Sequence, residues 1–170
     1  MPEKIELKDI LFGNVDSILR LAAEHNQQQY VEPVSKIIAI AFAGINEKCP
    51  GFLKAIYYDG QPAGMILIGK SPVSDEEPDA MQQYDYAYRI VEFFVDKCFQ
   101  RKGIGKAALT LALEKLKTLP ESENLPLYLE CHKDNKPALS FYESFEFQRL
   151  DYIYEDDFCV LVRFPIDEGL

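Results

Sequence analysis

The sequence predicts an α/β protein built on a mixed, mostly antiparallel twisted sheet of about seven strands with about four helices. Apolar residues recur at strand spacing in some segments and at helix spacing in others, in the order β-α-α-β-β-β-α-β-α-β-β. Short connections mark antiparallel hairpins on either side of a central strand–helix–strand crossover. These two observations together predict the fold class.

Length and charge limit the function classes. The 170 residues are 48% hydrophobic and 27% charged, so we expect one domain, residues 1–170, with a sizeable core. The formal net charge of −10 argues against a nucleic-acid partner, because clustered Lys and Arg supply most of the affinity for phosphate backbones. An acidic protein suits a cationic small-molecule substrate, although charge alone does not identify one.

The cysteines and histidines show no metal-ligand spacing. The four cysteines are scattered, and the chain has two histidines. We therefore expect no metal and a reducing, cytoplasmic location. Adjacent strand residues face opposite ways, which disfavours a Cys131–His132 nucleophile pair. Neither a signal peptide nor an apolar run of membrane-spanning length is recognised, so we expect no membrane partner. The sequence leaves a homodimer open.

The N-terminal third is predicted to contain a short strand and two helices. The strand covers residues 4–7. Asn14 or Asp16 is positioned to cap a helix that runs to about Glu24. Pro33 suits the first turn of a second helix, in which apolar residues recur at helical spacing.

Three strands are predicted in the centre of the sequence. Residues 52–58 and 63–69 are apolar runs joined across Asp59-Gly60, a strong signal for a two-residue hairpin turn. The stretch 71–83 is rich in Pro, Asp, Glu and Ser and predicts an exposed loop. A buried strand follows at about 88–95.

The remaining chain alternates helices and strands. A helix is expected from residue 104 to about 117, followed by a strand at 127–131. Pro137 is expected to open another helix. Two strands, at about 147–154 and 158–164, are predicted to form a closing hairpin.

A basic, glycine-containing segment, Gln100-Arg101-Lys102-Gly103-Ile104-Gly105-Lys106, separates the buried strand from the next helix. A Walker P-loop requires Gly in place of Gln100 and a hydroxyl in place of Ala107, so that pattern is excluded. A Rossmann turn fits Gly103 to Ala108, with Glu130 as its acidic partner. In a Rossmann fold, however, the glycines directly follow the strand, whereas several residues intervene in this chain. The chain after Glu130 is also too short to complete a Rossmann fold. An unliganded glycine turn is the simplest alternative.

The charges of this segment favour a bound anion over an unliganded turn. Lys and Arg at a helix N-terminus oppose the helix dipole unless an anion is present. A phosphate there meets backbone N–H groups and cations together, and glycine lets the backbone approach it closely. Residues 100–106 therefore predict a phosphate-binding loop.

The pattern Gln/Arg-x-x-Gly-x-Gly/Ala between a buried strand and an amphipathic helix resembles the acyl-CoA signature of the GNAT N-acetyltransferase superfamily. The element order resembles that family over nearly the whole chain. Further along, Asn135-Lys136-Pro137-Ala138 is similar to the family's Asn-x-x-Ala. Residues 141–147 resemble its Phe-Tyr-Glu-Lys-Leu-Gly-Phe element, with Glu146 here in place of the glycine. The resemblance implies the GNAT fold and acetyl-CoA as co-substrate.

The resemblance also implies cofactor contacts from three segments. Amides of the glycine-containing segment would bind the CoA pyrophosphate, and the end of the preceding strand would pair through its backbone with pantetheine. Asn135 would hydrogen-bond the cofactor arm. The residues expected to contact the cofactor are Phe93, Phe94, Val95, Gln100, Arg101, Lys102, Gly103, Ile104, Gly105, Lys106, Asn135, Ala138 and Tyr142.

Acetyl transfer to an amine poses two proton problems. An alkylammonium has a pKa of about 10.4, so forming the neutral amine at pH 7 costs roughly 4.6 kcal/mol. Glu92 is the candidate base, because a carboxylate is unusual in a buried strand; pairing with Arg89 is the alternative. Glu130 is a second candidate. The departing thiolate needs a proton donor, and Tyr142, which matches the family's catalytic tyrosine, is the candidate acid.

The sequence constrains the acceptor amine less strongly. Segments 27–31, 92–96 and 99–106 are most similar to the small bacterial spermine/spermidine acetyltransferases, and an acidic surface fits a polycation. We expect Tyr30, Glu32 and Glu92 to contact the substrate, with solvated surface as the alternative for Glu32. Other candidate activities are acetylation of a protein N-terminus, a lysine or another small amine. A non-catalytic acyl-CoA-binding regulatory domain is the alternative outside the enzymes.

Overall fold

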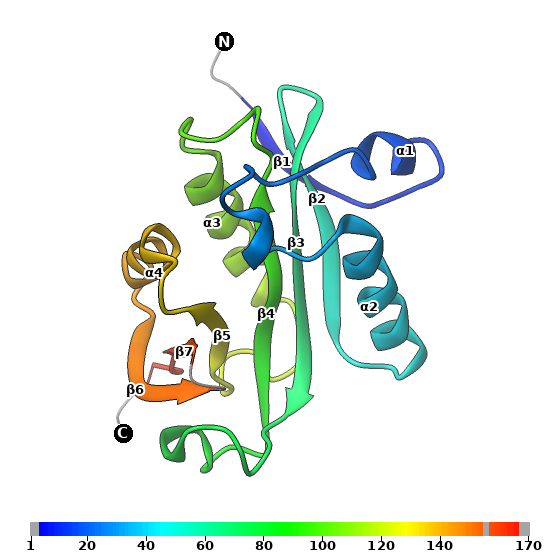
Figure 1. Cartoon of the computed structure of the whole chain (residues 1–170). Helices are drawn as coiled ribbons and strands as arrows, with labels where there is room; N and C mark the ends of the chain where they lie inside the picture. Colours follow the sequence, from blue (N-terminus) through cyan, green and yellow to red (C-terminus); the bar gives the residue numbers. More distant parts are fainter. Residues whose placement is uncertain (1–3, 155–156, 167–170) are drawn as a thin grey trace. The chain divides into compact units, whose positions relative to one another are not determined.

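The computed structural model describes residues 4–154 and 157–166, whose seven strands form one mixed sheet in the order β1-β2-β3-β4-β5-β7-β6 (Figure 1). Four α-helices lie within the described residues. The predicted fold class is therefore confirmed. The chain divides into two compact units, Met1–Gly69 with Val91–Pro120 and Lys70–Ile90 with Glu121–Leu170. Strands β3 (Gln61–Pro72) and β4 (Tyr86–Val95) contribute residues to both units.

The predicted hairpin is confirmed in the first unit. Strand β2 (Gly51–Tyr58) runs antiparallel to β3, and β1 (Ile5–Lys8) runs antiparallel to β2. Asp59 and Gly60 in the β2–β3 turn have φ of 46° and 80°. Positive φ at both central residues is typical of a type I′ turn, which favours Asp-Gly and matches the twist of the strands.

Strand residues of this unit alternate between two apolar layers. On one face, Tyr57 and Phe94 pack with residues of the first two helices. On the other face, Ile56 packs against Ile104 and Ala108 of the third helix. This alternation follows from the two-residue period of a strand. The three helices are α1 (Val15–Ile18), α2 (Val34–Asn46) and α3 (Ile104–Leu116).

Helix α1 is shorter than the sequence predicts, because it ends at Ile18 rather than near Glu24. The N–H of Ala22 donates to a carboxylate oxygen of Asp96 at 2.8 Å, and the Ala22 carbonyl accepts from the N–H of Lys97 at 3.0 Å. These tertiary hydrogen bonds satisfy the backbone groups of Ala22 outside a helix. Long-range contacts therefore override the local helical pattern.

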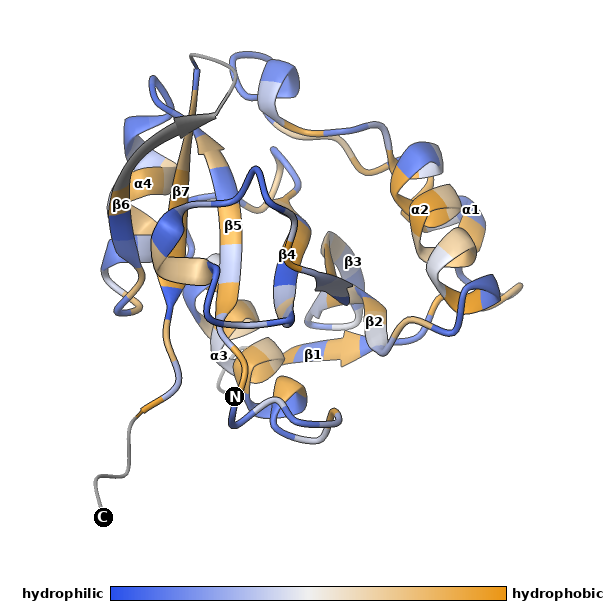
Figure 2. Cartoon of the chain, turned by 90° about the horizontal axis from the view of Figure 1, so that it is seen from below, coloured by the Kyte–Doolittle hydropathy of each residue, from blue (hydrophilic) through white to orange (hydrophobic). Residues whose placement is uncertain are grey.

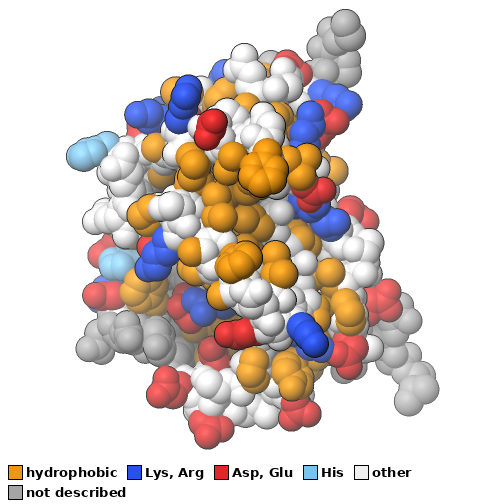
Figure 3. Space-filling model, turned by 90° about the vertical axis from the view of Figure 1, so that its right-hand side faces the viewer, with side chains coloured by type: hydrophobic (Ala, Val, Ile, Leu, Met, Phe, Trp, Pro, Cys, Tyr) orange, Lys and Arg blue, Asp and Glu red, His pale blue; other side chains and the backbone are white. Residues whose placement is uncertain are grey.

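Helix α2 confirms the second predicted helix, with Pro33 at its N-cap and Ile37 fully buried. The helix is hydrophobic over most of its length (Figure 2). Phe42 and Ile45 are 64% and 72% exposed, respectively. Hydrophobic side chains gather on the face of the molecule that carries α1 and α2 (Figure 3).

The second unit contains the strand that completes the predicted crossover and the predicted closing hairpin. Strand β5 runs parallel to β4 at Tyr88–Arg89 and antiparallel to β7, which also pairs with β6. The elements of this unit that follow β4 are β5 (Leu127–His132), α4 (Lys136–Glu143), β6 (Gln148–Tyr154) and β7 (Phe158–Arg163).

The segment 71–83 is anchored rather than simply exposed. Met81, at the end of the short 3-10 helix η2 (Asp79–Met81), is fully buried. The side-chain amide of Gln82 donates to the carbonyls of Ser74 and Glu77 at 2.8 and 2.9 Å. Composition predicts the exposed residues of this loop but misses the apolar anchor.

Candidate active site

The loop between β4 and α3, with the first turn of that helix, is called here the glycine loop, residues 96–106. Gly103 lies at the N-cap of α3 with φ of 75°, a left-handed conformation that glycine adopts without a steric penalty. Arg101 is also left-handed, with φ of 63°. Because Gly103 has no side chain, it leaves the first-turn N–H groups of α3 without a cap. Such N–H groups are the usual ligands of phosphate oxygens at helix N-termini.

Four exposed cations lie along this loop: Lys97, Arg101, Lys102 and Lys106. The Lys102 ammonium is 5.5 Å from the ring centroid of Tyr58 and 5.6 Å from that of Phe99, within cation–π range. The ammonium group of Lys102 therefore lies over the aromatic rings of Tyr58 and Phe99. The combination of uncapped N–H groups and positive charge fits the pyrophosphate of CoA.

The side chain of Gln100 turns into the loop. Its Nε2 donates to the carbonyl of Val95 at 3.0 Å and to Oε1 of Gln27 at 2.7 Å. A backbone carbonyl can only accept, so the contact with Val95 fixes which end of the Gln100 amide points inward. The side-chain amide of Gln100 therefore shapes the loop from within.

Within residues 4–150 and 157–166, whose burial the structure describes, Asp96 is the only buried charged residue, with 6% of its surface exposed. Its two carboxylate oxygens accept hydrogen bonds from the N–H groups of Ala22, at 2.8 Å, and Cys98, at 2.9 Å. Neither Asp96 nor Gln27 was predicted as a site residue, although both lie in segments that resemble the spermine/spermidine acetyltransferases. A carboxylate directly after a buried strand was the available signal for Asp96, whereas no local pattern predicted the contact of Gln27 with Gln100.

Glu92, the predicted base, is partly buried on β4 and shares a strand face with Phe94. Its Oε2 accepts a hydrogen bond from the N–H of Glu32 at 3.0 Å. Burial raises the pKa of Glu92 to about 7, although hydrogen bonds from the N–H groups of Glu32 and Phe93 act in the opposite direction. A carboxyl group with this pKa exchanges its proton near neutral pH.

A cavity of about 360 Å³ lies in the same unit, within the size range of small-molecule sites. Glu32 lines this cavity and bonds Glu92 through its N–H, while its carboxylate pairs with Lys36 at 2.7 Å. Tyr30, the other predicted substrate residue, is partly buried in the 3-10 helix η1 (Gln28–Tyr30). The lining residues are Leu21, Ala22, Ala23, Gln28, Val31, Glu32, Pro33, Val34 and Phe94.

In the second unit, Asn135 is the N-cap of α4, and its Oδ1 accepts a hydrogen bond from the N–H of Ala138 at 3.4 Å. Tyr142, the predicted acid, is 8% exposed on the same helix. Its ring packs edge-on against Phe147, with 5.7 Å between the ring centroids. Helix packing therefore fixes the position of this phenol.

Helix α4 ends in a Schellman motif. The N–H of Phe147 donates to the carbonyl of Tyr142 at 3.3 Å, and the N–H of Glu146 donates to the carbonyl of Glu143 at 3.1 Å. Glu146 has φ of 66°, the left-handed conformation for which glycine is preferred. The turn is therefore retained although Glu146 replaces the glycine.

Glu130, the second candidate base, pairs with Arg89 at 2.9 Å. Arg89 is also the residue considered as a structural partner for Glu92. Nearby, the Tyr128 hydroxyl donates to Glu77 at 3.2 Å, and burial raises the pKa of Tyr128 to about 12 and raises the pKa of Glu77. These groups tie the segment 71–83 to β5.

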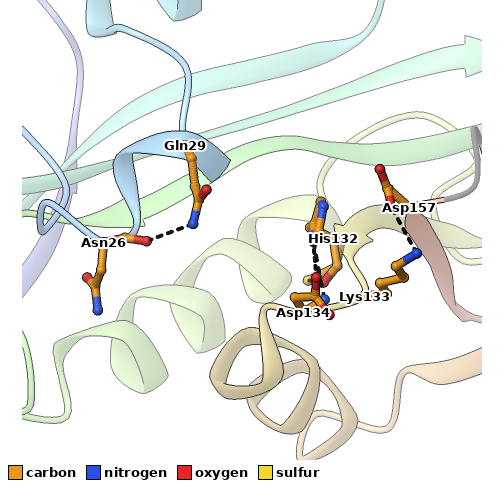
Figure 4. Close-up of polar contacts among 7 residues, drawn as sticks. Asn26, Gln29, His132, Lys133, Asp134 and Asp157 are labelled. Atoms are coloured by element: carbon orange, nitrogen blue, oxygen red, sulfur yellow. Dashed lines mark hydrogen bonds and ion pairs between the residues drawn. The ribbon is translucent and has the colours of Figure 1, made fainter.

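His132 and Cys131 have separate surroundings at the end of β5. The Nδ1 atom of His132 accepts from the N–H of Asp134 at 3.2 Å, and Lys133 pairs with Asp157 at 2.8 Å (Figure 4). Burial raises the pKa of the Cys131 thiol to about 11, which keeps it protonated and weakly nucleophilic at neutral pH. This supports the exclusion of a Cys–His nucleophile pair.

A model of the acetyltransferase (GNAT) family matches residues 17–147, a range that includes the glycine loop and Tyr142. The chain belongs to the acetyltransferase (GNAT) family. It is therefore an acetyl-CoA-dependent N-acetyltransferase, as the sequence predicts.

Two curated GNAT relatives share just over a quarter of their residues with this chain. A Bacillus subtilis subsp. natto (strain BEST195) protein named probable spermine N(1)-acetyltransferase is 28% identical over 145 residues, covering 85% of this chain and 88% of the relative. A spermine/spermidine N(1)-acetyltransferase of Bacillus subtilis (strain 168) is 27% identical over the same shares.

Solved structures share the GNAT fold at lower identity. Arabidopsis thaliana Naa50, in complex with the bisubstrate analogue CoA-Ac-MVNAL, superposes with a TM-score of 0.62 and 21% identity, covering 94% of this chain and 97% of that chain. The PaiA N-acetyltransferase of Thermoplasma acidophilum, in complex with coenzyme A, superposes with a TM-score of 0.61 and 15% identity, covering 93% and 98%.

Two negative findings apply to the described part of this GNAT chain. None of the helices in residues 4–154 and 157–166 is long and apolar enough to cross a membrane. Among those same residues, His, Cys, Asp and Glu side chains do not gather in groups of three or more that could hold a metal ion.

Proposed function

We propose that this GNAT enzyme transfers the acetyl group directly from acetyl-CoA to a primary amine, with a polyamine such as spermidine or spermine as the acceptor. The observation that carries this proposal is Glu92. It is a partly buried carboxyl group whose pKa is raised to about 7, and it bonds Glu32, a residue that lines the cavity. This is the arrangement required for a base that deprotonates a bound amine at neutral pH.

Bound acetyl-CoA supplies a thioester carbon that a neutral amine attacks. An alkylammonium with a pKa of about 10.4 is almost entirely protonated at pH 7. Glu92, with a pKa of about 7, is half ionised at that pH, so it takes the proton either directly or through one water. Tyr142 then donates its hydroxyl proton to the departing sulfur. The buried position of Tyr142 on α4 supports this assignment, because packing holds the phenol in place.

The donor side of the proposal rests on the glycine loop. Its N–H groups, with Arg101 and Lys106, would hold the pyrophosphate. The backbone of residues 93–95 would pair with pantetheine, and Asn135 and Ala138 would contact the cofactor arm at the start of α4. The uncapped first turn of α3 and the exposed cations around it support this placement.

A polyamine acceptor is supported by charge and by the relatives. Glu32 lines the cavity, the carboxyl group of Glu92 bonds the backbone N–H of Glu32, and the net charge of −10 attracts a polycation. Both curated relatives carry names that specify spermine or spermidine acetylation. We further propose that residues 1–170 act as one acetyltransferase domain in the cytoplasm, without a nucleic-acid partner.

The α-amine of a peptide or protein N-terminus is the second candidate acceptor. Leu21, Val31, Val34 and Phe94 make the cavity lining largely apolar, which suits a hydrophobic first side chain. An α-amine has a pKa of about 7.7–8.0, so its deprotonation demands less of the base. The Naa50 structure contains a bisubstrate analogue that ends in a peptide.

A substrate panel tests the proposal. The rate of acetyl-CoA consumption should be measured with spermidine, spermine, lysine, single amino acids and short peptides that begin with Met or Ser. We expect the highest kcat/KM with a polyamine. Turnover on peptides with none on polyamines would move the assignment to the second candidate. Tight CoA binding without turnover on any amine would contradict the catalytic proposal.

A further inference from the structure

We propose that the contact between Gln27 and Gln100, supported by Asp96, couples acyl-CoA binding to amine binding. This inference rests on the proposed placement of the cofactor at the glycine loop and of the amine in the cavity. The cavity is lined mainly by residues 21–34, called here the acceptor segment. Gln27 and Asp96 are positioning residues, because they act through the loop and the segment rather than on the reacting atoms.

The acceptor segment is held by polar contacts along its whole length. The side chains that hold it are spaced four residues apart on β4 and the glycine loop, so they follow one continuous stretch of chain. The three contacts are Asp96 with the N–H of Ala22 at 2.8 Å, Gln100 with Gln27 at 2.7 Å, and Glu92 with the N–H of Glu32 at 3.0 Å.

The contact at Gln27 is the one that a substitution can remove selectively. Asp96 also accepts the N–H of Cys98 and is almost fully buried, so its loss would disturb the loop itself. Glu92 has the proposed catalytic role. Gln27 contributes a single carbonyl oxygen to Gln100, whose other contact, with Val95, stays in place.

Acyl-CoA binding and amine binding are coupled because acyl-CoA and the acceptor segment stabilise the same conformation of the glycine loop. The loop contains a non-glycine residue, Arg101, in the left-handed region, which carries a conformational cost and requires support from its surroundings. A pyrophosphate bound to the loop N–H groups favours that conformation, which is also the one that presents Gln100 to Gln27. By linkage, acyl-CoA then favours the ordered acceptor segment, and an amine bound there favours acyl-CoA by the same factor.

Four proteins test the coupling: wild type, Gln27→Ala, Gln27→Glu and Gln29→Ala. The Ala variant removes the acceptor oxygen, whereas Glu retains one for Gln100. Gln29 is the matched control, because it lies in the same turn and its exposed side chain donates only to the nearby carbonyl of Asn26, at 3.3 Å, among its described contacts (Figure 4). Hydrogen exchange is measured for each protein without CoA and at saturating CoA.

We expect CoA to slow exchange in both the glycine loop and the acceptor segment of wild type, Gln27→Glu and Gln29→Ala. In Gln27→Ala, CoA should still protect the loop but no longer the segment. Segment protection that persists in Gln27→Ala would overturn the proposal. A wild-type loop that CoA does not protect would instead show that the cofactor placement itself is wrong.

The affinity for the amine is a second measurement. If Gln27 had only a structural role, its substitution would not change the effect of CoA on that affinity. The affinity for the amine that wild type acetylates fastest is measured with and without saturating CoA. We expect CoA to tighten amine binding about fivefold or more in wild type and in Gln27→Glu, and less than about twofold in Gln27→Ala. Equal tightening in wild type and Gln27→Ala would refute the coupling, as would no tightening in wild type. If the wild-type protein acetylates none of the amines, the proposed function is wrong, and this outcome is distinct from a failure of the coupling.

Discussion

Replacing Glu92 by Gln should change the pH dependence of catalysis as well as its rate. Gln preserves the size of the side chain and an oxygen that accepts the N–H of Glu32, but it cannot take a proton. With Glu92 titrating at about 7, the wild-type kcat/KM for the amine should rise roughly tenfold between pH 6 and pH 8 and then level off. The variant can use only amine that is already neutral in solution.

The size of the defect follows from the two pKa values. An amine of pKa about 10.4 is neutral in roughly one molecule in 250 at pH 8, so Glu92→Gln should lower kcat/KM about 250-fold there. Each further pH unit should then recover about tenfold of the loss, because the neutral amine becomes tenfold more abundant. Initial rates with acetyl-CoA from pH 6 to pH 9.5 measure both curves. Glu24→Gln, an exposed carboxylate on the acceptor segment, is the control and should follow wild type.

Stability provides an independent check on the same carboxyl group. Its folded pKa of about 7 lies above the ordinary value of 4.5, so between these pH values the folded protein holds a proton that the unfolded chain has lost. Wild-type stability should therefore fall, relative to Glu92→Gln, as pH rises from about 4.5 to 7, by on the order of 3 kcal/mol. Urea unfolding at pH 5 and pH 8 measures the difference. Parallel pH–rate curves for the two proteins, or an equal stability difference at both pH values, would refute Glu92 as the base.

Three other substitutions test the second unit. Tyr142→Phe should lower kcat by about 100-fold with little change in CoA affinity, and an unchanged kcat would remove its role as acid. Glu146→Gly should raise the free energy of unfolding by about 0.5–1 kcal/mol in urea titrations, because it relieves the left-handed backbone; a destabilised variant would contradict the Schellman assignment. Met81→Ala should lower the free energy of unfolding by about 2–5 kcal/mol, because Met81 is the buried anchor of segment 71–83, whereas exposed Gln83→Ala should change it by less than about 0.5 kcal/mol.

Local signals in the sequence predict much of this fold. Asp59-Gly60 dictates a turn with positive φ at both residues, and the structure has that turn. The glycine segment predicts the start of α3 correctly, because Gly103 supplies the left-handed N-cap. In both cases the determining residues lie next to the structure they specify.

Long-range contacts explain what the sequence does not predict. Helix α1 ends early because Ala22 bonds Asp96 and Lys97, which lie more than seventy residues away in the sequence. The side chain of Gln100 also bonds Gln27, a residue on another segment that no periodicity identifies. The raised pKa of Glu92 reflects its burial in the folded chain, so the sequence shows the carboxylate but not the environment that raises its pKa.

Direct transfer to an amine is the central claim, and a two-substrate initial-rate experiment with product analysis tests it most directly. Acetyl-CoA and spermidine are varied together, and the amine product is identified by mass spectrometry. Direct transfer predicts acetylated spermidine, intersecting double-reciprocal lines and release of CoA only when the amine is present. Parallel lines with a burst of CoA released before any amine is added would show an acetyl-enzyme and contradict direct transfer.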